Sequence, residues 1–236
     1  MAEQIEGISL VLPTRRRPDQ FIRMYQSALE TASEPRGVSC SIYVDDDDLG
    51  SLEEIGGALL PRLTITVGPR ILLSSAWNAA QEQASGPIFM HCGDDIIFRT
   101  NDWDENVRLA FGQFQDRIVF VYGRDGFQHD GFGTHGFLHE RWIDTVGYFV
   151  PPHFSSDYND TWLNEVAQAI KRHVLLPDVL TEHMHFIAHK GEIDEVHQER
   201  MERGKADNVA GIYASLAEKR QQDIRRLSLA IEAASY

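Results

Sequence analysis

The sequence has only two cysteines, Cys40 and Cys92, and their spacing fits neither a metal site nor a disulfide framework. It also lacks any stretch that approaches the roughly 20 consecutive apolar residues of a membrane-spanning helix. The first residues, Met1 to Gly7, are polar and acidic, unlike a secretion signal. We therefore expect neither a signal nor a membrane span, and the cysteine usage fits a reducing cytoplasm.

Positive charge is scarce as well, because the formal net charge is −14 at pH 7. A protein that gains its main affinity by covering nucleic-acid phosphates with Lys and Arg needs a positive surface, so this class is disfavoured. Basic residues gather only locally, at Arg15 to Arg17, at Lys171-Arg172, and at Lys219-Arg220 with Arg225-Arg226. With 236 residues, of which 42% are hydrophobic, the chain can bury a substantial core and still lies within the range of one domain.

Short apolar runs alternate with amphipathic segments in the N-terminal half. This pattern is typical of strands joined by crossover helices in a mainly parallel α/β sheet. The predicted strands are Ile8 to Pro13, Val38 to Val44, Leu63 to Val67 and Pro87 to Cys92. The predicted helices between them are Phe21 to Leu29, Ser51 to Leu60 and Leu73 to Ala84.

The second half is less regular. The stretch from Gly123 to Phe137 is rich in Gly, His and aromatic residues, which is the composition of a binding loop. From about Asn208 one apolar stripe predicts a helix that packs on the body or on a partner subunit. We expect a main α/β domain over residues 1–205 and a C-terminal helical extension over 206–236. The other predicted elements are helices over Asp102 to Phe114, Glu140 to Val146 and Asp160 to Ile170, and strands over Ile118 to Tyr122 and Val174 to His185.

Polar residues follow each of the first four predicted strands. In open α/β sheets, ligands bind outside the carboxyl ends of the strands, so these residues are the first candidates for a site. Together they bring arginines and carboxylates to one edge, which suits a ligand with a diphosphate and a hydroxylated ring. The four groups are Pro13-Thr14-Arg15-Arg16-Arg17, Asp45-Asp46-Asp47-Asp48, Gly68-Pro69-Arg70 and Gly93-Asp94-Asp95.

Two of these groups are acidic. A hard divalent cation prefers carboxylate oxygens and leaves open positions for a substrate phosphate, so Asp94-Asp95 is a candidate metal site. An isolated Asp-Asp pair is also a common solvated turn, and its place directly after a buried strand favours function. In the other group we expect Asp47 and Asp48 to cap the helix near Ser51 and Asp45 or Asp46 to face the site.

The order and spacing of these pieces resemble the family 2-like glycosyltransferases of the GT-A fold. The resemblance spans roughly residues 7 to 185 and rests on Leu12-Pro13-Thr14-Arg15, Val44-Asp45-Asp46, Arg70, Asn78-Ala79-Ala80 and Gly86 through Ile96. It implies a GT-A fold, with Pro13, Thr14 and Arg15 lining a nucleotide base and Asp46, or else Asp45, bonding its ring nitrogen. It further implies base and diphosphate contacts from Arg70 and Asn78, a ribose contact from Asp94, and an Mn²⁺ or Mg²⁺ ion on Asp95. Gly93 stands where many members have the first aspartate of an Asp-x-Asp motif, which leaves the metal on Asp95.

Further residues follow from the same likeness. The segment Phe154 to Leu163 lies where the family carries an acidic catalytic motif, with Asp157 as first choice for the general base and Asp160 as second. Capping of the following helix is an equally good interpretation of Asp160. His183 and His185 point to one face of a strand and are candidates for a third metal ligand, with His185 preferred. His135 and His139 fit better as acceptor-site or loop residues.

The sequence therefore predicts a metal-assisted glycosyltransferase that moves a sugar from a nucleotide-diphosphate donor, with UDP as the expected nucleotide, to a hydroxyl acceptor with inversion. The acceptor is a glycan or small molecule, with a hydroxymethylated pyrimidine in DNA as an alternative. A sugar-phosphate nucleotidyltransferase is disfavoured because the segment after the first strand has arginines and no glycine. A non-catalytic nucleotide-sugar-binding module remains a third alternative.

Overall fold

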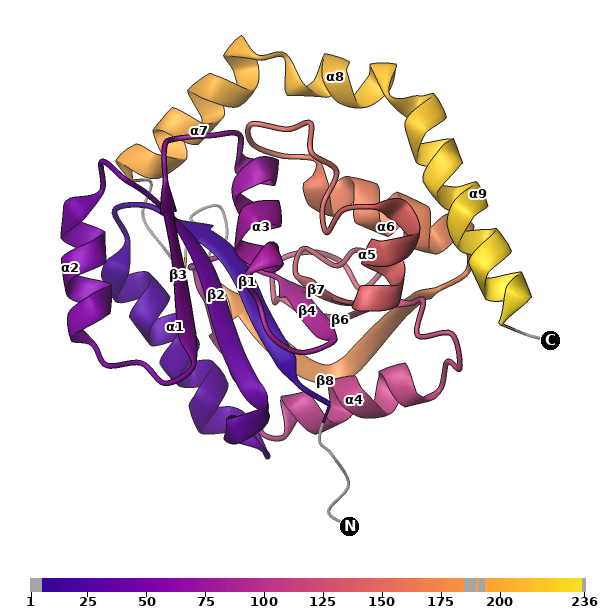
Figure 1. The fold of residues 1–236 in the computed structure, drawn as a ribbon, viewed down its shortest axis with the longest axis horizontal. Coiled ribbons are helices and arrows are strands. Elements are labelled where there is room, and N and C mark those ends of the chain that lie inside the picture. The colour runs from indigo at the N-terminus through magenta and orange to yellow at the C-terminus, as the bar shows by residue number, and fades with distance from the viewer. Residues whose placement is uncertain (1–5, 185–189, 191–193, 235–236) are drawn as a thin grey trace.

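A computed structural model describes residues 6–184, 190 and 194–234 (Figure 1). Its centre is an eight-stranded sheet in the order β3-β2-β1-β4-β7-β6-β8-β5. β1 to β4 run parallel, as do β6 and β8, while β7 and β5 run antiparallel to their neighbours. The expected mainly parallel α/β sheet is confirmed.

The N-terminal half contains the crossover units that the apolar pattern predicts. Residues of β1 alternate between two cores, since Leu10 and Leu12 pack with helix α1 on one face and Val11 packs with α3 on the other. Pro18 opens α1, a position that suits its fixed φ and missing N–H. The elements are β1 (Ile8–Thr14), α1 (Pro18–Thr31), η1 (Pro35–Gly37), β2 (Val38–Asp45), α2 (Leu49–Gly57), β3 (Leu63–Gly68), α3 (Leu73–Glu82) and β4 (Ile88–His91).

The second half adds two short strands that the sequence pattern does not indicate. β7 begins at the end of the stretch expected to be a loop and inserts antiparallel between β4 and β6, while β5 pairs with the end of β8. Three or four residues are too few for the alternation that marks a strand. The elements are β5 (Ile96–Phe98), α4 (Trp103–Gly112), β6 (Phe120–Arg124), β7 (Gly136–His139), α5 (Glu140–Val146), α6 (Asn159–Ala169) and β8 (His173–His183).

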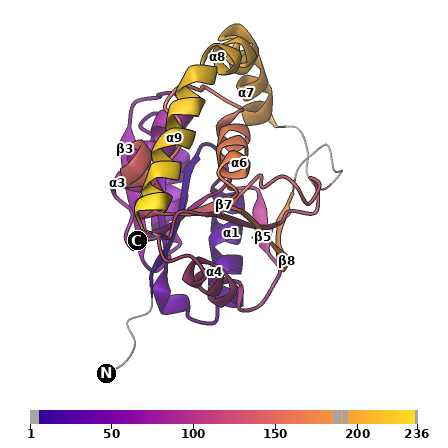
Figure 2. The same ribbon diagram turned by 90° about the vertical axis from the view of Figure 1, so that its right-hand side faces the viewer.

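Three helices close the chain, α7 (Glu195–Ala206), α8 (Val209–Ser215) and α9 (Ala217–Ala233), and they form an arc around one side of the molecule (Figures 1 and 2). The apolar stripe of α9 packs against α5 and α6 of the same chain, with Leu227 fully buried. Asp223, also on α9, accepts hydrogen bonds from the Tyr148 hydroxyl and from Trp162 Nε1. Among the described residues, no helix combines the length and apolar character needed to span a membrane.

Candidate functional site

A cavity of about 620 Å³ opens at the carboxyl ends of β1, β2 and β4. The parallel register brings these ends together, because β1 pairs with both β2 and β4. Most residues expected at the site line this cavity: Pro13, Thr14, Arg15, Asp45, Arg70, Asp94, Asp95, Asp157, Asp160 and His183. Asp46 and Asn78 do not line it, and His185 lies outside the described residues.

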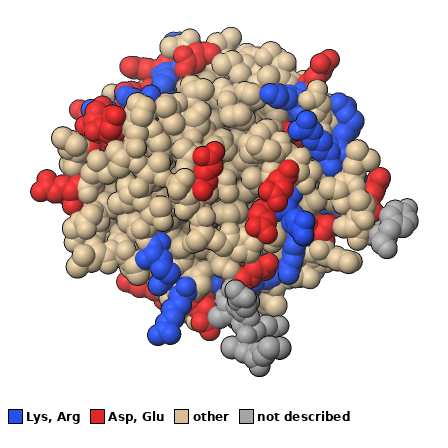
Figure 3. Space-filling model, in the orientation of Figure 1, with Lys and Arg blue, Asp and Glu red and all other residues tan. Residues whose placement is uncertain are grey.

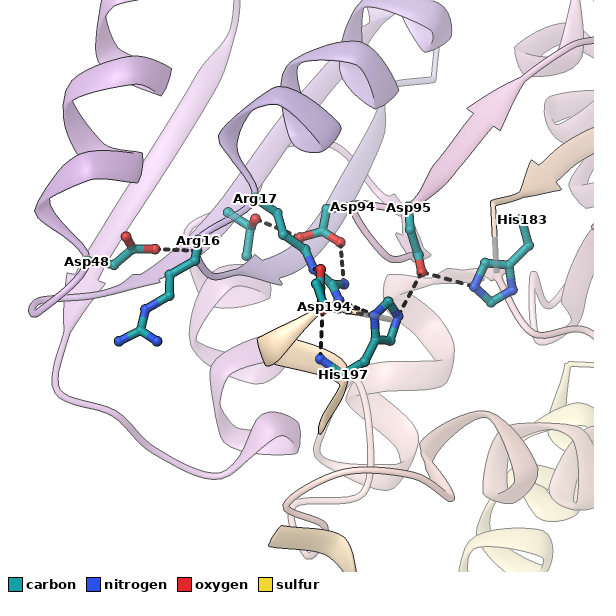
Figure 4. A network of polar contacts seen from close by, with 9 residues as sticks. Arg16, Arg17, Asp48, Asp94, Asp95, His183, Asp194 and His197 are labelled. Atoms are coloured by element: carbon teal, nitrogen blue, oxygen red, sulfur yellow. Dashed lines mark hydrogen bonds and ion pairs between the residues drawn. The ribbon is translucent and has the colours of Figure 1, made fainter. Parts of the chain in front are cut away.

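Asp94 lines the cavity and is held by residues at and just after the end of β1. Its carboxylate accepts a hydrogen bond from Thr14 Oγ1 at 2.8 Å and lies 3.4 Å from Arg17 Nη1 (Figure 4). Burial raises the pKa of Asp94 to about 6 even though the charge of Arg17 opposes the shift. Asp94 is therefore a restrained carboxylate that lines the cavity.

Asp95 lies beside two histidines from distant parts of the chain. The pairing of β5 with β8 places His183 Nε2 3.2 Å from Asp95 Oδ2, and His135 comes from the segment just before β7 (Figure 4 shows Asp95 and His183). Ligand atoms of Asp95, His135 and His183 all lie within 4.8 Å of one another. Burial alone would raise the pKa of Asp95, but the hydrogen bond from His183 and the charge of Arg17 help to hold it below its usual range. The group is a compact cluster of one carboxylate and two imidazoles.

His135 shows that this cluster fits a metal ion. Both of its ring nitrogens are buried, and neither has a hydrogen-bond partner among the described residues. Burial lowers the pKa of His135 to about 3, so the ring is neutral and keeps a lone pair for coordination. A buried imidazole without partners is costly unless something binds it. The sequence analysis predicted a loop or acceptor-site role for both His135 and His139. His139 caps α5 by accepting a hydrogen bond from Arg141 N.

The acidic group after β2 divides between the cavity and the next helix. Asp45 lines the cavity and accepts from Arg15 Nη1 at 2.9 Å, with Arg70 Nε at 4.0 Å, whereas Asp46 is exposed and outside the cavity. The preference for Asp46 over Asp45 therefore does not fit the structure. Asp48 caps α2 through Ser51 N, as expected, but Asp47 does not and instead accepts from Arg15. Successive side chains of a strand point to opposite faces of the sheet, so the residue at which β2 ends decides which of these carboxylates faces the cavity.

Asn78 has a structural role in place of the expected contact with the donor. Its Nδ2 donates to the carbonyls of Ser74 and Val150, each at 2.9 Å, and its Oδ1 accepts from the amides of Phe149 and Val150. These bonds use the donors and acceptor of the amide and fix the 149–150 segment on α3.

Two carboxylates stand at the start of α6, on either side of Tyr158. Asp157 is exposed, 3.5 Å from Arg200 Nη1, while Asp160 is half-buried and accepts from Thr161 N at 2.7 Å. Burial raises the pKa of Asp160 to about 6. Tyr158 has φ of 74°, a left-handed conformation that is rare for a large side chain and concentrates at functional sites.

Solved structures of glycosyltransferases share this arrangement of elements. The mannosyltransferase PcManGT from Pyrobaculum calidifontis, in complex with GDP-Man and Mn²⁺, matches 98% of this chain and 75% of its own with a TM-score of 0.55 and 13% identity. Residues 1–349 of S. aureus TarS, in complex with UDP, match 81% of this chain and 68% of their own with a TM-score of 0.55 and 15% identity. This chain has the GT-A glycosyltransferase fold. No protein-family model matches it, and no curated protein does so by sequence.

Helix α7 covers the GT-A cavity and contributes the residues that the sequence pattern misses. Its N-cap residue, Asp194, accepts from Arg17 Nε at 2.7 Å and from Arg17 Nη2 at 2.5 Å (Figure 4). Of its side chains, Val196, His197, Arg200 and Arg203 line the cavity. α7 has few apolar residues and is held largely by charges, so hydrophobic periodicity does not mark it. The Asp194-Glu195 start is the one local signal for this helix.

Aromatic side chains also line the GT-A cavity. Trp77 packs on His91 with ring centroids 4.3 Å apart, and Phe127 and Phe132, on the segment between β6 and β7, also line the cavity. Three other tryptophans are buried in the core: Trp103, Trp142 and Trp162. Trp77 differs from them because α3 turns it toward the cavity.

Proposed function

We propose that this protein is a glycosyltransferase that moves a sugar from a nucleoside diphosphate donor to a hydroxyl group with the help of a divalent metal. The observation that carries the proposal is the Asp95, His135 and His183 cluster at the same cavity as the Asp45 pocket. The fold supports it, because the similar structures hold GDP-Man with Mn²⁺ in one case and UDP in another.

The donor would lie along the ends of β1, β2 and β4. Pro13 and Arg15 flank the base, and the carboxylate of Asp45 accepts a base N–H, which suits uracil or guanine; we propose UDP-sugars first. Thr14 holds Asp94 toward the ribose hydroxyls. The diphosphate then reaches the Asp95 cluster. Arg15 and Arg17, both bound to carboxylates, position these acids.

Asp95, His135 and His183 would hold the ion. Two imidazoles with one carboxylate fit Mn²⁺ better than Mg²⁺, which prefers oxygen ligands. When bound, such an ion offsets the negative charge that grows on the leaving diphosphate. The neutral state of His135 means that binding need not displace a proton from that ring.

The general base is Asp160 in this proposal, with Asp157 second. A base acts best when its pKa lies near the working pH, and burial brings the pKa of Asp160 to about 6. Asp157 is exposed and paired with Arg200. The acceptor hydroxyl would approach past Trp77, Phe127 and Phe132, an apolar wall that suits the face of a sugar ring.

The surface gives little support to a DNA acceptor. Arg15, Arg17 and Arg172 are paired with carboxylates, and Arg220 is buried over the Tyr213 ring. On the face in Figure 3, basic side chains form separate groups next to acidic ones and do not make one continuous track. A glycan or small-molecule hydroxyl is therefore the proposed acceptor.

A donor screen tests the proposal. The protein is incubated with UDP-, GDP- and TDP-sugars and Mn²⁺, and released nucleoside diphosphate and glycosylated products are measured by mass spectrometry. We expect release from one nucleotide class, lost in Asp95→Asn. Pyrophosphate release from a nucleoside triphosphate and a sugar phosphate would instead identify a nucleotidyltransferase. Binding of a donor without turnover, even with acceptors present, would identify a binding module.

A further inference from the structure

Two arginines of α7 face the cavity one helical turn apart. Arg200 and Arg203 lie on the same side of the helix as His197, because residues three apart are neighbours on a helix surface. His197 Nε2 is 4.0 Å from Asp95 Oδ2, so this end of α7 lies at the candidate metal cluster. Arg203 lies toward Arg70 and Asp45, at the candidate base pocket. The two guanidiniums therefore border the space between the two ends of the proposed donor site.

Arg200 and Arg203 are less closely paired with carboxylates than the other arginines of the cavity. Arg15, Arg17 and Arg70 each have a carboxylate within hydrogen-bond distance. Arg203 has no hydrogen bond or ion pair with the residues that the structure describes, and its Nε is buried without a partner. Arg200 has a buried Nε in the same condition and one ion pair, to the exposed Asp157 at 3.5 Å.

Such an arrangement opposes stability. Burial lowers the pKa of Arg203, and the nearby charge of Arg70 lowers it further. The charges of Glu199, Asp45 and Asp207 oppose this shift without cancelling it. A partly buried guanidinium with no carboxylate in direct contact is retained at a cost when a ligand supplies a closer negative charge.

We propose that Arg200 and Arg203 form a phosphate-binding pair. Guanidinium groups match phosphate oxygens with parallel N–H donors, and two of them a turn apart can hold one phosphate or two linked ones. The phosphate belongs to the donor's diphosphate or to a phosphate-bearing acceptor. This inference rests on the proposed function, because the pair lies in the cavity proposed to bind the donor. Phosphate binding can nevertheless be measured without sugar transfer.

The test uses full-length Arg200→Gln, Arg203→Gln and the double variant. Lys205→Gln is the matched control, because Lys205 is an exposed cation on the same helix outside the cavity. Affinities for UDP, uridine, pyrophosphate and inorganic phosphate are measured by calorimetry with and without Mn²⁺. We expect each arginine variant to lower the affinity for a phosphate-bearing probe by about tenfold, since losing a hydrogen bond to a charged group has roughly that effect. Lys205→Gln should leave this affinity unchanged.

The probes separate the two sources. Weakened UDP binding with unchanged uridine binding identifies the donor diphosphate, whereas unchanged UDP binding with weakened phosphate binding identifies an acceptor phosphate. The melting temperature without ligand excludes a merely structural role. Arg203→Gln should melt at a higher temperature than the wild type, because the substitution removes a partly buried cation next to Arg70. Unchanged affinity for every phosphate probe, or a lower ligand-free melting temperature in Arg203→Gln, would overturn the proposal.

The same data keep the two proposals apart. If the wild type binds UDP with Mn²⁺ and the arginine variants bind it equally well, and phosphate binding is also unchanged, the phosphate pair fails and the glycosyltransferase stands. If the wild type shows no metal-dependent UDP binding, but Arg203→Gln binds pyrophosphate more weakly than the wild type does, the phosphate-binding pair stands and the donor assignment fails.

Discussion

Replacing His135 with asparagine tests whether the three-residue cluster holds a metal. An ion that binds the folded chain stabilises it by about 2.7 kcal/mol when its concentration is one hundred times its Kd. A domain of this length gains about 2–4 °C in Tm for each kcal/mol, so Mn²⁺ at that concentration should raise the wild-type Tm by about 5–11 °C.

The variant should lose most of this gain. Removing a partner that only orients a ligand weakens metal affinity by about 10–100-fold, so removing a ligand itself should weaken it by at least about 100-fold. At the same Mn²⁺ concentration the stabilisation then falls to about 0.4 kcal/mol and the gain in Tm to about 1–2 °C. Without metal the variant should fold normally, because both ring nitrogens of His135 lack hydrogen-bond partners among the described residues.

The assay is thermal melting with and without Mn²⁺, after chelator treatment. His129→Asn is the matched control, because His129 is exposed in the same segment and does not line the cavity. It should keep the full wild-type gain. A full gain in His135→Asn, alongside loss in Asp95→Asn, would refute the three-ligand cluster and leave His135 without a role in metal binding.

Two further predictions concern carboxylates. The pKa of Asp160 is raised to about 6, so its contribution to stability is complete below the unfolded pKa near 3.9 and is lost as pH rises through 6. Asp160→Asn should therefore melt at a higher temperature than the wild type at pH 7, and the difference should vanish near pH 4. In the same variant, the fall of kcat/KM on the acid side of pH 6 should disappear. An equal effect from Asp157→Asn on that fall would contradict the choice of base. Asp104 is fully buried and accepts from Ser33 N, Glu34 N and Arg108, so Asp104→Ala should lower the free energy of unfolding by about 3 kcal/mol without changing UDP affinity, as urea unfolding and calorimetry would show. Because its pKa is lowered, Asp104 loses its contribution as pH falls below 3.9, and a variant as stable as wild type at pH 7 would contradict this account.

The sequence alone determined the parallel half of the sheet and the residues at its edge. Apolar runs and helical spacing are local, and parallel strands necessarily bring their carboxyl ends to one side. Thr14, Asp94 and one of the pair Asp45 and Asp46 could therefore be placed together without a structure, and the structure puts Thr14, Asp94 and Asp45 at the cavity.

Only the tertiary structure decided the rest of the site. His183 stands 88 positions from Asp95 and reaches it because β5, a strand of three residues, pairs with β8. His135 joins them through β7, whose insertion between β4 and β6 has no signature in the local pattern. Helix α7 is placed by ion pairs such as Arg17 with Asp194, and charges carry no periodicity from which a docking face can be read. Local patterns fix what depends on neighbours in the chain, whereas the metal cluster and the cover of the cavity depend on contacts between segments far apart in it.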